Sequence, residues 1–457
     1  MKPKTSPNSN FETISKRIQK EMKRLRVPGV AIGIHHKGKE WTAGFGVTSL
    51  ENPLPVNSDT LMQVGSISKT FTATLLMMLA ERGKVKLDLP VRRYIKDFKL
   101  KDESVAKKVT VRHLLTHTGG WVGDYFNSFG DGDDALDKMV KDISHLPQIQ
   151  PLGKIWSYNN TGFNVASRVI EVVTKKPYEQ ALQDMLLDPL GLNMSFLYPS
   201  DILFTHRFVV GHYRKDGKTH VSRPWAIGRA GNGVGGVVST VNDLLKYARF
   251  HMGDGKSPSG NKIIKRKSLQ AMRVKQVSAG GRGDMGITWF IRYADNLTAY
   301  AHGGATNGQQ AYFFYIPEKD FALAILTNSD EGGVITAQTF GWALDLYFGI
   351  KLKSPKPMKN PQDGKEFIGR YKIGTECFDI KTKGKYLVFH HIPLGGFPTP
   401  DEPPGPALPP MRFAFYEKDN LIGLDEPYNG ALADIIRDEK GRVKYFRVGG
   451  RAHLKIK

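Results

Sequence analysis

Cysteine is almost absent from this sequence, which has a single such residue, Cys377, in 457. One cysteine excludes an internal disulfide and any metal cluster built on cysteine ligands. The chain also lacks an uninterrupted apolar run of about 18 residues, the length that a membrane-spanning helix needs. The sequence therefore predicts a folded protein with no integral membrane segment.

Acidic residues are also scarce. Asp and Glu number 44 against 66 Lys and Arg, which gives a formal net charge of +22. Such a charge fits a nucleic-acid or anionic-membrane partner, or basic side chains spread over a large surface. Neither an RNA-binding aromatic signature nor a zinc-finger spacing is present. We therefore favour the interpretation that the basic side chains are spread over the surface, and we expect no nucleic-acid partner.

The N-terminal segment is basic and lacks the continuous apolar core of a secretory signal, which favours a cytoplasmic location. A signal that has already been removed is the alternative, and it stays open. Apolar residues recur at helical spacing through this segment, so we predict an amphipathic helix that packs against the body of the protein. The apolar side of this helix contains Phe11, Ile14, Ile18, Met22 and Leu25.

Strand patterns occur at both ends of the first 350 residues, and helical patterns dominate between them. Residues 29–47 predict two strands joined by a tight turn, and residues 284–327 predict an antiparallel meander, with a helix at 334–350. Residues from about 60 to 280 are mostly helical. The simplest assembly is an α/β (α+β) fold, in which one antiparallel sheet is flanked by helices and carries a large helical insertion.

Residues 353–365, "KSPKPMKNPQDGK", have the proline- and lysine-rich composition of a linker. We therefore predict a first domain over residues 1–352 and a second over residues 366–457. Short strand-like runs in the second domain predict an all-β, barrel-like fold.

The segment "QVGSISKTFTATLLMMLAERGKV" is an ordinary apolar helix except in its first turn, where Ser66 precedes Lys69 by one turn. These positions share a helix face, so the amine can reach the hydroxyl, and a helix N-terminus suits a developing oxyanion. A neutral lysine can take the serine proton if burial or a cationic neighbour lowers its pKa from about 10.4. Alone, this S-x-x-K pattern is weak, because many helices begin with serine and carry an exposed lysine.

Two further elements strengthen that hypothesis. "WSYNNTGFNVASRVIEVVT" places Tyr158 and Asn160 just before a predicted helix, and "AHGGATNG" places His302 and Gly304 at the end of a predicted strand. The three elements, in this order, reproduce the pattern of the serine β-lactamase and penicillin-binding protein superfamily. The chain resembles its class C β-lactamases, family VIII carboxylesterases and D-aminopeptidases over about residues 12–350.

The resemblance implies a β-lactamase-like fold, a lipocalin-like C-terminal barrel and a role for each motif residue. Ser66 is the expected nucleophile that forms an acyl-enzyme, and Lys69 shares its proton network. Tyr158 is the expected general base, which then protonates the leaving group. Asn160 is expected to orient Lys69 and to hydrogen-bond a substrate carbonyl. The backbone N–H groups of Ser66 and Ala305 are the expected oxyanion hole.

One position departs from the β-lactamase pattern. His302 stands where those enzymes carry Lys-Thr-Gly, whose lysine helps to hold the β-lactam carboxylate. A histidine has an unperturbed pKa of about 6.5 and is mostly neutral at pH 7, so it holds an anion less firmly. We therefore expect a serine hydrolase for esters or short peptides, including D-peptides, with weak or absent β-lactam hydrolysis.

Several alternatives stay open at this point. The fold could serve as a catalytically silent module that binds peptidoglycan peptides or a partner. We expect a small-molecule ester or peptide substrate and no cofactor, and formation of a homo-oligomer stays open. His113 and His117 have the spacing of a helical metal pair, but no acidic third ligand accompanies them, so we expect no metal.

The run "GNGVGG", residues 231–236, matches a dinucleotide-binding fingerprint. No clear strand precedes it, and a capped helix is predicted to begin after Thr240. We interpret the run as a glycine-rich turn.

Overall fold

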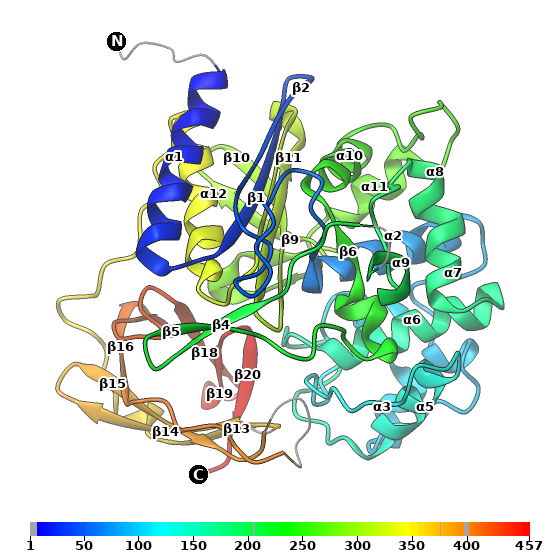
Figure 1. The fold of residues 1–457 in the computed structure, drawn as a ribbon. Helices are drawn as coiled ribbons and strands as arrows, with labels where there is room; N and C mark the ends of the chain where they lie inside the picture. Colours follow the sequence, from blue (N-terminus) through cyan, green and yellow to red (C-terminus); the bar gives the residue numbers. More distant parts are fainter. Residues whose placement is uncertain (1–6, 204–205, 375, 397–401) are drawn as a thin grey trace.

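The computed structural model describes residues 7–203, 206–374, 376–396 and 402–457. Its main feature is an eight-stranded antiparallel sheet with helices on both faces, and a closed barrel packs beside one end of this assembly (Figure 1). This architecture confirms the predicted α+β fold with an all-β C-terminal part.

The sheet is built from both ends of the first 350 residues, as predicted. β1 (Gly29–His36) is the second strand from one edge and is buried along almost its whole length, because helices cover both of its faces. A positive-φ turn at Lys37 and Gly38 joins it to its neighbour, which is the predicted tight hairpin. In spatial order the strands are β2 (Lys39–Gly46), β1 (Gly29–His36), β12 (Phe321–Thr327), β11 (Gln309–Ile316), β10 (Leu297–Thr306), β9 (Phe290–Ala294), β8 (Asp284–Met285) and β7 (Val277–Ser278).

The segment "MGITWFIRY" differs from the single strand that its composition predicts. The structure divides it between β8 and β9, with a bend between them. Thr288 has a φ of 66°, and a Cβ on Gly286 would lie 2.3 Å from the Met272 carbonyl oxygen. The close packing of Gly286 against the end of a helix therefore interrupts the strand.

The helical insertion covers one face of the sheet. α2 (Ser68–Glu81) is buried on nearly all sides, and apolar and hydroxyl-bearing residues make up most of it. Two small two-stranded sheets lie outside the main sheet: the hairpin of β4 (His212–Lys215) and β5 (Lys218–Val221), and the pair of β3 (Met62–Gln63) with β6 (Val238–Ser239). The helices of this region are α2 (Ser68–Glu81), α3 (Glu103–Lys108), α4 (Val111–Leu115), α5 (Ala135–Asp142), α6 (Asn160–Thr174), α7 (Tyr178–Leu182), α8 (Asp188–Leu190), α9 (Pro199–Leu203), α10 (Val241–Met252) and α11 (Arg266–Met272).

The other face of the sheet carries α1 (Pro7–Leu25) and α12 (Gly332–Phe348), which pack against each other (Figure 1). All five apolar residues predicted to face the body from the first helix are buried: Phe11, Ile14, Ile18, Met22 and Leu25. The prediction that this basic helix packs on the protein is therefore confirmed.

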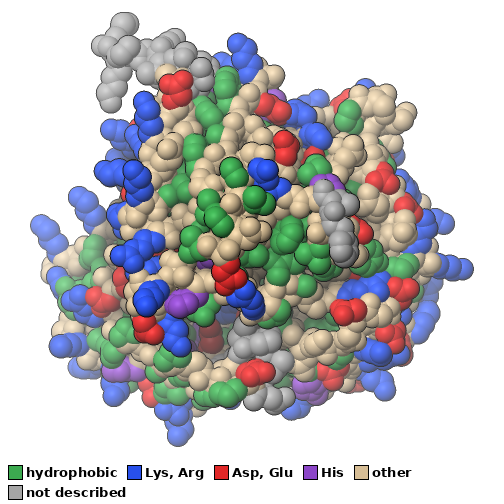
Figure 2. All heavy atoms as spheres, viewed as in Figure 1, with side chains coloured by type: hydrophobic (Ala, Val, Ile, Leu, Met, Phe, Trp, Pro, Cys, Tyr) green, Lys and Arg blue, Asp and Glu red, His purple; other side chains and the backbone are tan. Residues whose placement is uncertain are grey.

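Basic side chains do not gather in one patch on the face that Figure 2 draws. On the face drawn in Figure 2, Lys and Arg side chains are scattered across the view and around its outline, with Asp and Glu among them. Among the described helices, none combines the length and the apolar character that crossing a bilayer requires.

The C-terminal part forms a closed up-and-down barrel of the lipocalin-like kind. Aromatic side chains such as Phe389, Phe413 and Phe446 pack together inside it. The predicted division of the chain at 353–365 stays a prediction. The strands are β13 (Gly369–Ile373), β14 (Glu376–Lys383), β15 (Tyr386–Pro393), β16 (Met411–Glu417), β17 (Asn420–Gly423), β18 (Leu432–Arg437), β19 (Val443–Val448) and β20 (Arg451–Lys455).

The packing of α1 can be tested with Ile18→Ala. Ile18 is fully buried between α1 and the sheet, so removing its side chain should lower the free energy of unfolding by about 2–5 kcal/mol. Chemical denaturation measures this change. Lys20→Ala, at an exposed position of the same helix, is the control and should change stability by less than about 0.5 kcal/mol. Equal effects of the two substitutions would show that α1 does not pack as described.

Candidate active site

Ser66 and Lys69 lie at the start of α2. Ser66 belongs to a 3-10 turn, Gly65–Ile67, which leads into the α-helix at Ser68, so the helix starts slightly later than predicted. Ser66 is partly exposed, whereas Lys69 is fully buried. Lys69 Nζ lies 3.0 Å from Ser66 Oγ, as the spacing of the two residues predicts.

Lys69 has an unusual environment for a lysine. Its amine also donates to the carbonyl oxygen of Val234 at 2.9 Å, and no carboxylate of the described residues forms an ion pair with it. Burial lowers the pKa of Lys69 well below its usual value, the positive charge of Arg451 lowers it further, and Asp124 opposes both. The uncharged amine is therefore strongly favoured relative to an exposed lysine.

The Val234 carbonyl is presented by the glycine-rich run. Asn232–Gly236 forms a single π-helical turn, and α10 begins after Thr240, whose hydroxyl accepts the N–H of Asp243. These observations confirm a glycine-rich turn before a capped helix. A Cβ on Gly233 would lie 1.9 Å from Ser167 Oγ, so the turn can pack against α6 only without a side chain there.

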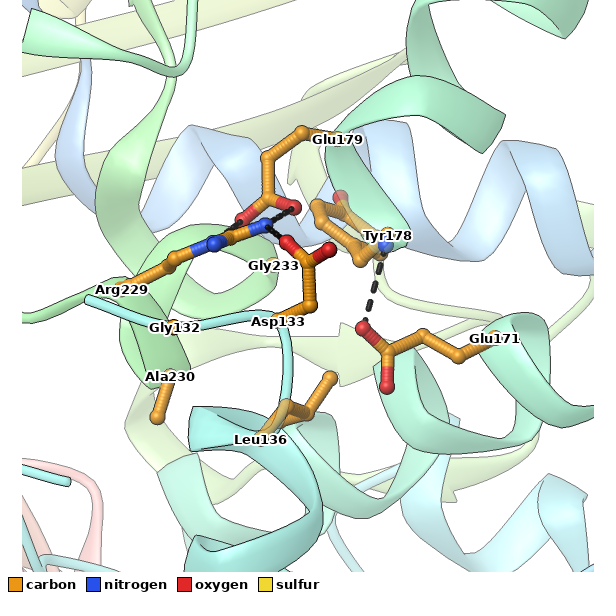
Figure 3. Close-up of a pocket in the computed structure, with 9 residues that line it drawn as sticks. All are labelled: Gly132, Asp133, Leu136, Glu171, Tyr178, Glu179, Arg229, Ala230 and Gly233. Carbon is orange, nitrogen blue, oxygen red and sulfur yellow. Dashed lines mark hydrogen bonds and ion pairs between the residues drawn. The ribbon is translucent and has the colours of Figure 1, made fainter. Parts of the chain in front are cut away.

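Charged side chains fix the other side of this turn. Asn232 Nδ2 donates to Glu179 at 2.7 Å, and the guanidinium of Arg229 lies between Glu179 and Asp133 (Figure 3). The small pocket in Figure 3 lies between this ion pair and Glu171, whose carboxylate accepts the N–H of Tyr178 at 3.1 Å. Since the same turn carries Val234, this network holds the carbonyl that Lys69 contacts.

Tyr158 lies just before α6, with its ring against the lysine. Lys69 Nζ is 5.1 Å from the centre of the Tyr158 ring. Burial raises the pKa of Tyr158 to about 12, and the nearby Ser66 hydroxyl opposes this rise. His117, for which no catalytic role was predicted, stacks on the same ring with 4.3 Å between centroids.

The backbone of β10 passes directly beside Ser66. A Cβ on Gly304 would lie 1.9 Å from the carbonyl oxygen of Val64 and 3.0 Å from the backbone nitrogen of Ser66. A Cβ on Gly65 would lie 2.5 Å from the backbone nitrogen of Ala305. Both glycines are needed because two backbones approach each other here, and this approach places Ser66 and Ala305 side by side.

His302 occupies the interior of the same strand. It is 1% exposed, lies edge-on to Phe290, and faces the Tyr158 ring with 6.4 Å between centroids. Burial lowers its pKa to about 3, with a further contribution from Lys69. His302 is therefore neutral at physiological pH, and its ring packs behind Tyr158.

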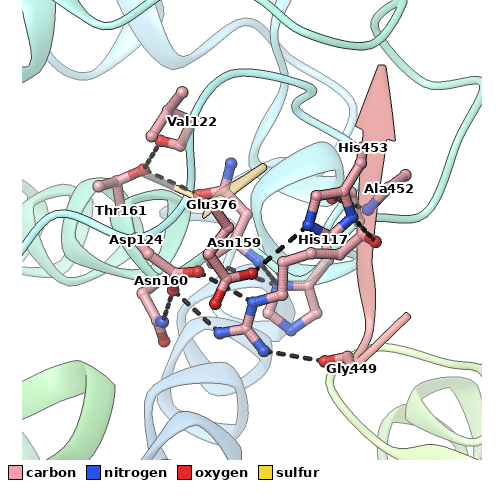
Figure 4. A network of polar contacts seen from close by, with 12 residues as sticks. His117, Val122, Asp124, Asn159, Asn160, Thr161, Glu376, Gly449, Ala452 and His453 are labelled. Carbon is pink, nitrogen blue, oxygen red and sulfur yellow. Dashed lines mark hydrogen bonds and ion pairs between the residues drawn. The ribbon is translucent and has the colours of Figure 1, made fainter. Parts of the chain in front are cut away.

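Asn160 differs from its predicted role as a direct partner of Lys69. Its side-chain amide donates to Asp124 at 2.6 Å (Figure 4), and Lys69 is held by Val234 instead. Asp124 in turn forms a two-pronged ion pair with Arg451, at 2.9 and 3.0 Å. Asn160 is thus linked to the barrel rather than to the lysine.

Arg451 and Asp124 were not found by sequence reasoning, although they border the site. They are 327 residues apart, and Arg451 lies on β20 of the barrel with its guanidinium 4.8 Å from the centre of the Tyr158 ring. The glycine pair that precedes Arg451 predicts a hairpin. Nothing in its local sequence indicates where that hairpin docks.

The β19–β20 hairpin docks on the segment that carries Tyr158. The backbone N–H of Tyr158 donates to the Gly450 carbonyl at 2.8 Å, and that of Ala452 donates to Ser157 Oγ at 3.2 Å. Arg447 donates to the Trp156 carbonyl at 3.0 Å. The barrel therefore helps to position Tyr158 beside Ser66.

The close approach of β10 to Ser66 can be tested with Gly304→Ala. The new Cβ would overlap the Val64 carbonyl, so strand and turn would have to separate, with an expected loss of about 1–3 kcal/mol in stability. Gly303→Ala is the matched control, because its Cβ would make only an ordinary contact, 3.6 Å from Tyr312. Thermal unfolding of both variants measures the difference, and equal melting temperatures would contradict the described packing.

Comparison with known proteins agrees with this geometry. A model of the Beta-lactamase family matches residues 14–345. The chain is 32% identical over 358 residues to penicillin-binding protein 4 of Amycolatopsis lactamdurans, with 76% of this chain and 93% of that protein covered.

Two solved structures match the chain over nearly its whole length, barrel included. The structure of SurE with D-Leu has a TM-score of 0.76 at 21% identity and covers 98% of this chain and 100% of that one. The octameric penicillin-binding protein homologue from Pyrococcus abyssi has a TM-score of 0.62 at 25% identity and covers 97% of this chain and 100% of that one. The family model matches most of the chain, and the similarity to penicillin-binding protein 4 also covers most of it. The chain therefore belongs to the beta-lactamase family of serine hydrolases.

Proposed function

We propose that this hydrolase cleaves esters or short peptides through an acyl-enzyme on Ser66, with Lys69 and Tyr158 as its proton-transfer groups. The observation that carries the proposal is the contact of 3.0 Å between Ser66 Oγ and a fully buried lysine amine whose pKa is strongly lowered. Such an amine can accept a proton, whereas an exposed lysine at neutral pH cannot.

The reaction follows from these positions. Ser66 Oγ attacks the substrate carbonyl while its proton passes to Lys69 Nζ, and the Val234 carbonyl stabilises the resulting ammonium. The backbone N–H groups of Ser66 and Ala305 bind the oxyanion at the site where strand and turn approach. Collapse of the tetrahedral species breaks the bond to the leaving group, and water later hydrolyses the acyl-enzyme.

Tyr158 supplies the proton for the leaving group. Its pKa, raised to about 12, keeps the phenol protonated near pH 7, so it acts as an acid more readily than as a first base. The proton that Lys69 took from Ser66 then passes to the Tyr158 phenolate, because the Lys69 ammonium lies beside the ring, and both groups regain their starting states. In this proposal Lys69 accepts the first proton and Tyr158 donates the later one. The proposal therefore differs from the expected role of Tyr158 as the initial base.

The neutral state of His302 supports an ester or peptide substrate over a β-lactam. At its position the lysine of β-lactamases adds a positive charge, and a buried histidine with a pKa of about 3 adds none. We therefore propose that β-lactam hydrolysis is weak or absent, and that Asn160 contacts the substrate carbonyl through the side of its amide that does not face Asp124.

The nucleophile can be identified with a fluorophosphonate probe and intact-protein mass spectrometry. We expect one adduct on the wild type and none on Ser66→Ala. Ser68→Ala is the matched control and should still be labelled, because the Ser68 hydroxyl is buried and accepts the N–H of Val237. A folded wild type that gains no adduct would favour a binding module over an enzyme.

In ester turnover, Tyr158→Phe should reduce kcat by about 10²–10⁴-fold.

Arg451 and Asp124 have opposite effects on the pKa of Lys69, so their substitutions should shift the pH profile of kcat/KM in opposite directions. Lys69 must be neutral to accept the proton, so kcat/KM rises with pH through the pKa of Lys69. Arg451→Gln removes a charge that lowers this pKa and should move the acidic limb to higher pH. Asp124→Asn removes a charge that raises it and should move the limb to lower pH.

The control for this pH profile is Lys455→Gln, on the same strand, where the amine contacts the Glu366 carbonyl away from the site. This substitution should leave the acidic limb in place. Shifts of the same sign in the Arg451 and Asp124 variants would contradict the assignment of Lys69 as the base.

A further inference from the structure

The segment that carries Tyr158 depends on distant parts of the chain for its conformation. Ser157, Tyr158 and Asn159 precede α6 and belong to no helix or strand, so no regular hydrogen-bond ladder holds them. Their three backbone N–H groups nevertheless all have acceptors. That of Tyr158 donates to Gly450 of the barrel at 2.8 Å, and the other two donate to a single residue, His117.

His117 accepts these two N–H groups through different atoms. Its backbone carbonyl accepts the N–H of Ser157 at 3.0 Å. Its Nδ1 lies 3.0 Å from the backbone nitrogen of Asn159 and 3.2 Å from the Asn159 carbonyl oxygen (Figure 4). Because a backbone N–H can only donate, we assign Nδ1 as the acceptor and place the imidazole proton on Nε2. One residue thus holds the chain immediately before and immediately after Tyr158.

The imidazole of His117 also packs on the Tyr158 side chain. The ring centroids are 4.3 Å apart and the ring planes are inclined by 27°. The same imidazole lies 5.1 Å from the ring of Phe163 on α6, and Lys69 Nζ lies over the Tyr158 and Phe163 rings at 5.1 and 5.8 Å. His117 is fully buried, so it contributes to the orientation of the phenol beside the lysine.

The backbone conformation of His117 is uncommon. Its φ is 54°, in the left-handed region, where histidine is found more often than most residues other than glycine. In this conformation the carbonyl and the side chain of one residue both reach the Tyr158 segment. Backbone conformations of this kind persist where the surrounding contacts hold them, and they cluster at active sites.

The imidazole of His117 is suited to an acceptor role. Burial lowers its pKa well below the usual value, and the positive charges of Lys69 and His302 lower it further. The neutral ring keeps the lone pair on Nδ1 that the Asn159 N–H requires. The other nitrogen, Nε2, is buried and has no hydrogen-bond partner among the described residues. The contacts of His117 with the Tyr158 segment are therefore packing and hydrogen-bond acceptance.

From these contacts we propose that His117 is the positioning residue for Tyr158, and that it holds the phenol in the orientation that delivers a proton to the leaving group. The inference rests on the proposed hydrolase function and adds to it a fully buried residue. A proton donor must lie within hydrogen-bond distance of the atom that it protonates. A displacement of about 1 Å can lower the rate by about 10²-fold. Positioning by His117 therefore matters most when the leaving group needs a proton.

The test compares two esters of phenylacetic acid, the ethyl ester and the 4-nitrophenyl ester. Acylation of either joins the phenylacetyl carbon to Ser66 Oγ and breaks the bond to the leaving oxygen. Ethoxide is strongly basic, so it takes the Tyr158 proton and leaves as ethanol, after which Lys69 returns a proton to Tyr158. 4-Nitrophenolate leaves as a stable anion without that proton, and Lys69 releases its proton to solvent.

The measured quantity is the ratio of kcat/KM for the nitrophenyl ester to kcat/KM for the ethyl ester, in full-length protein. Both esters form the same acyl-enzyme, so the ratio reports acylation alone. A substitution that merely damages the site lowers both values and leaves the ratio unchanged. A substitution that displaces the proton donor raises the ratio.

His117→Ala removes the imidazole and should raise this ratio by about 10- to 100-fold. His117→Asn keeps an acceptor near the position of Nδ1 and tolerates a positive φ, but it loses the ring that packs on Tyr158. Its ratio should lie between those of the wild type and His117→Ala. Tyr158→Phe removes the donor itself and should raise the ratio at least as much as His117→Ala.

His113→Ala is the matched control. His113 lies four residues earlier, and its Nδ1 accepts the backbone N–H of Thr110 at 3.1 Å, so the variant loses the same kind of hydrogen bond away from Tyr158. It should leave the ratio as in the wild type. Melting temperatures verify that each variant is folded, and if His117→Ala does not fold, His117→Asn is compared with His113→Asn.

An unchanged ratio in the folded His117 variants overturns the positioning role, as does an equal rise in the His113 control. An unchanged ratio in Tyr158→Phe also overturns it, because another group then protonates the leaving oxygen. The fluorophosphonate experiment separates these results from failure of the function on which the inference rests. A labelled Ser66 with any of them, or with turnover of neither ester, leaves the nucleophile in place, whereas an unlabelled Ser66 in a folded protein removes the proposed function itself.

Discussion

Burial of Lys69 against Ser66 is the constraint on which the site depends. An ammonium enclosed by protein without a carboxylate partner is unfavourable, and the neutral amine relieves that cost. The surroundings are consistent with this state, because one backbone carbonyl, from Val234, and one hydroxyl satisfy the amine. The fold thus gives up the stability of a charged, solvated lysine at this position and gains a proton acceptor beside a hydroxyl.

The barrel also contributes to the electrostatics around Lys69 and Ser66. Its β19–β20 hairpin provides the carbonyl that receives the N–H of Tyr158, and its Arg451 adds a positive charge that disfavours protonation of Lys69. Asp124 compensates Arg451 and also anchors Asn160. The candidate site, in which Ser66 is the proposed nucleophile, is therefore completed by β20 of the barrel.

The cations around the site divide into two kinds. Arg451 and Arg447 are each neutralised by an aspartate, so their charges act mainly on neighbouring groups and on the docking of the barrel. Arg282 forms no ion pair with a described residue, and burial together with the charge of Arg451 lowers its pKa to about 10. The buried His302 and His117, whose pKa values burial lowers, add no charge at neutral pH. Compensation and burial, rather than residue type, therefore decide which groups carry an unbalanced charge near the site.

The local features of this protein follow from its sequence. The apolar stripe of α1, the hairpin turn at Lys37, and the one-turn spacing of Ser66 and Lys69 depend on neighbours a few residues away, and these predictions were confirmed. Only the tertiary structure decided the partner of Asn160, the contact of Lys69 with the glycine-rich turn and the position of Arg451 beside Tyr158. The reason is physical: burial and Coulomb interactions depend on distance in space, and the segments that supply them here are separated by up to 327 residues along the chain.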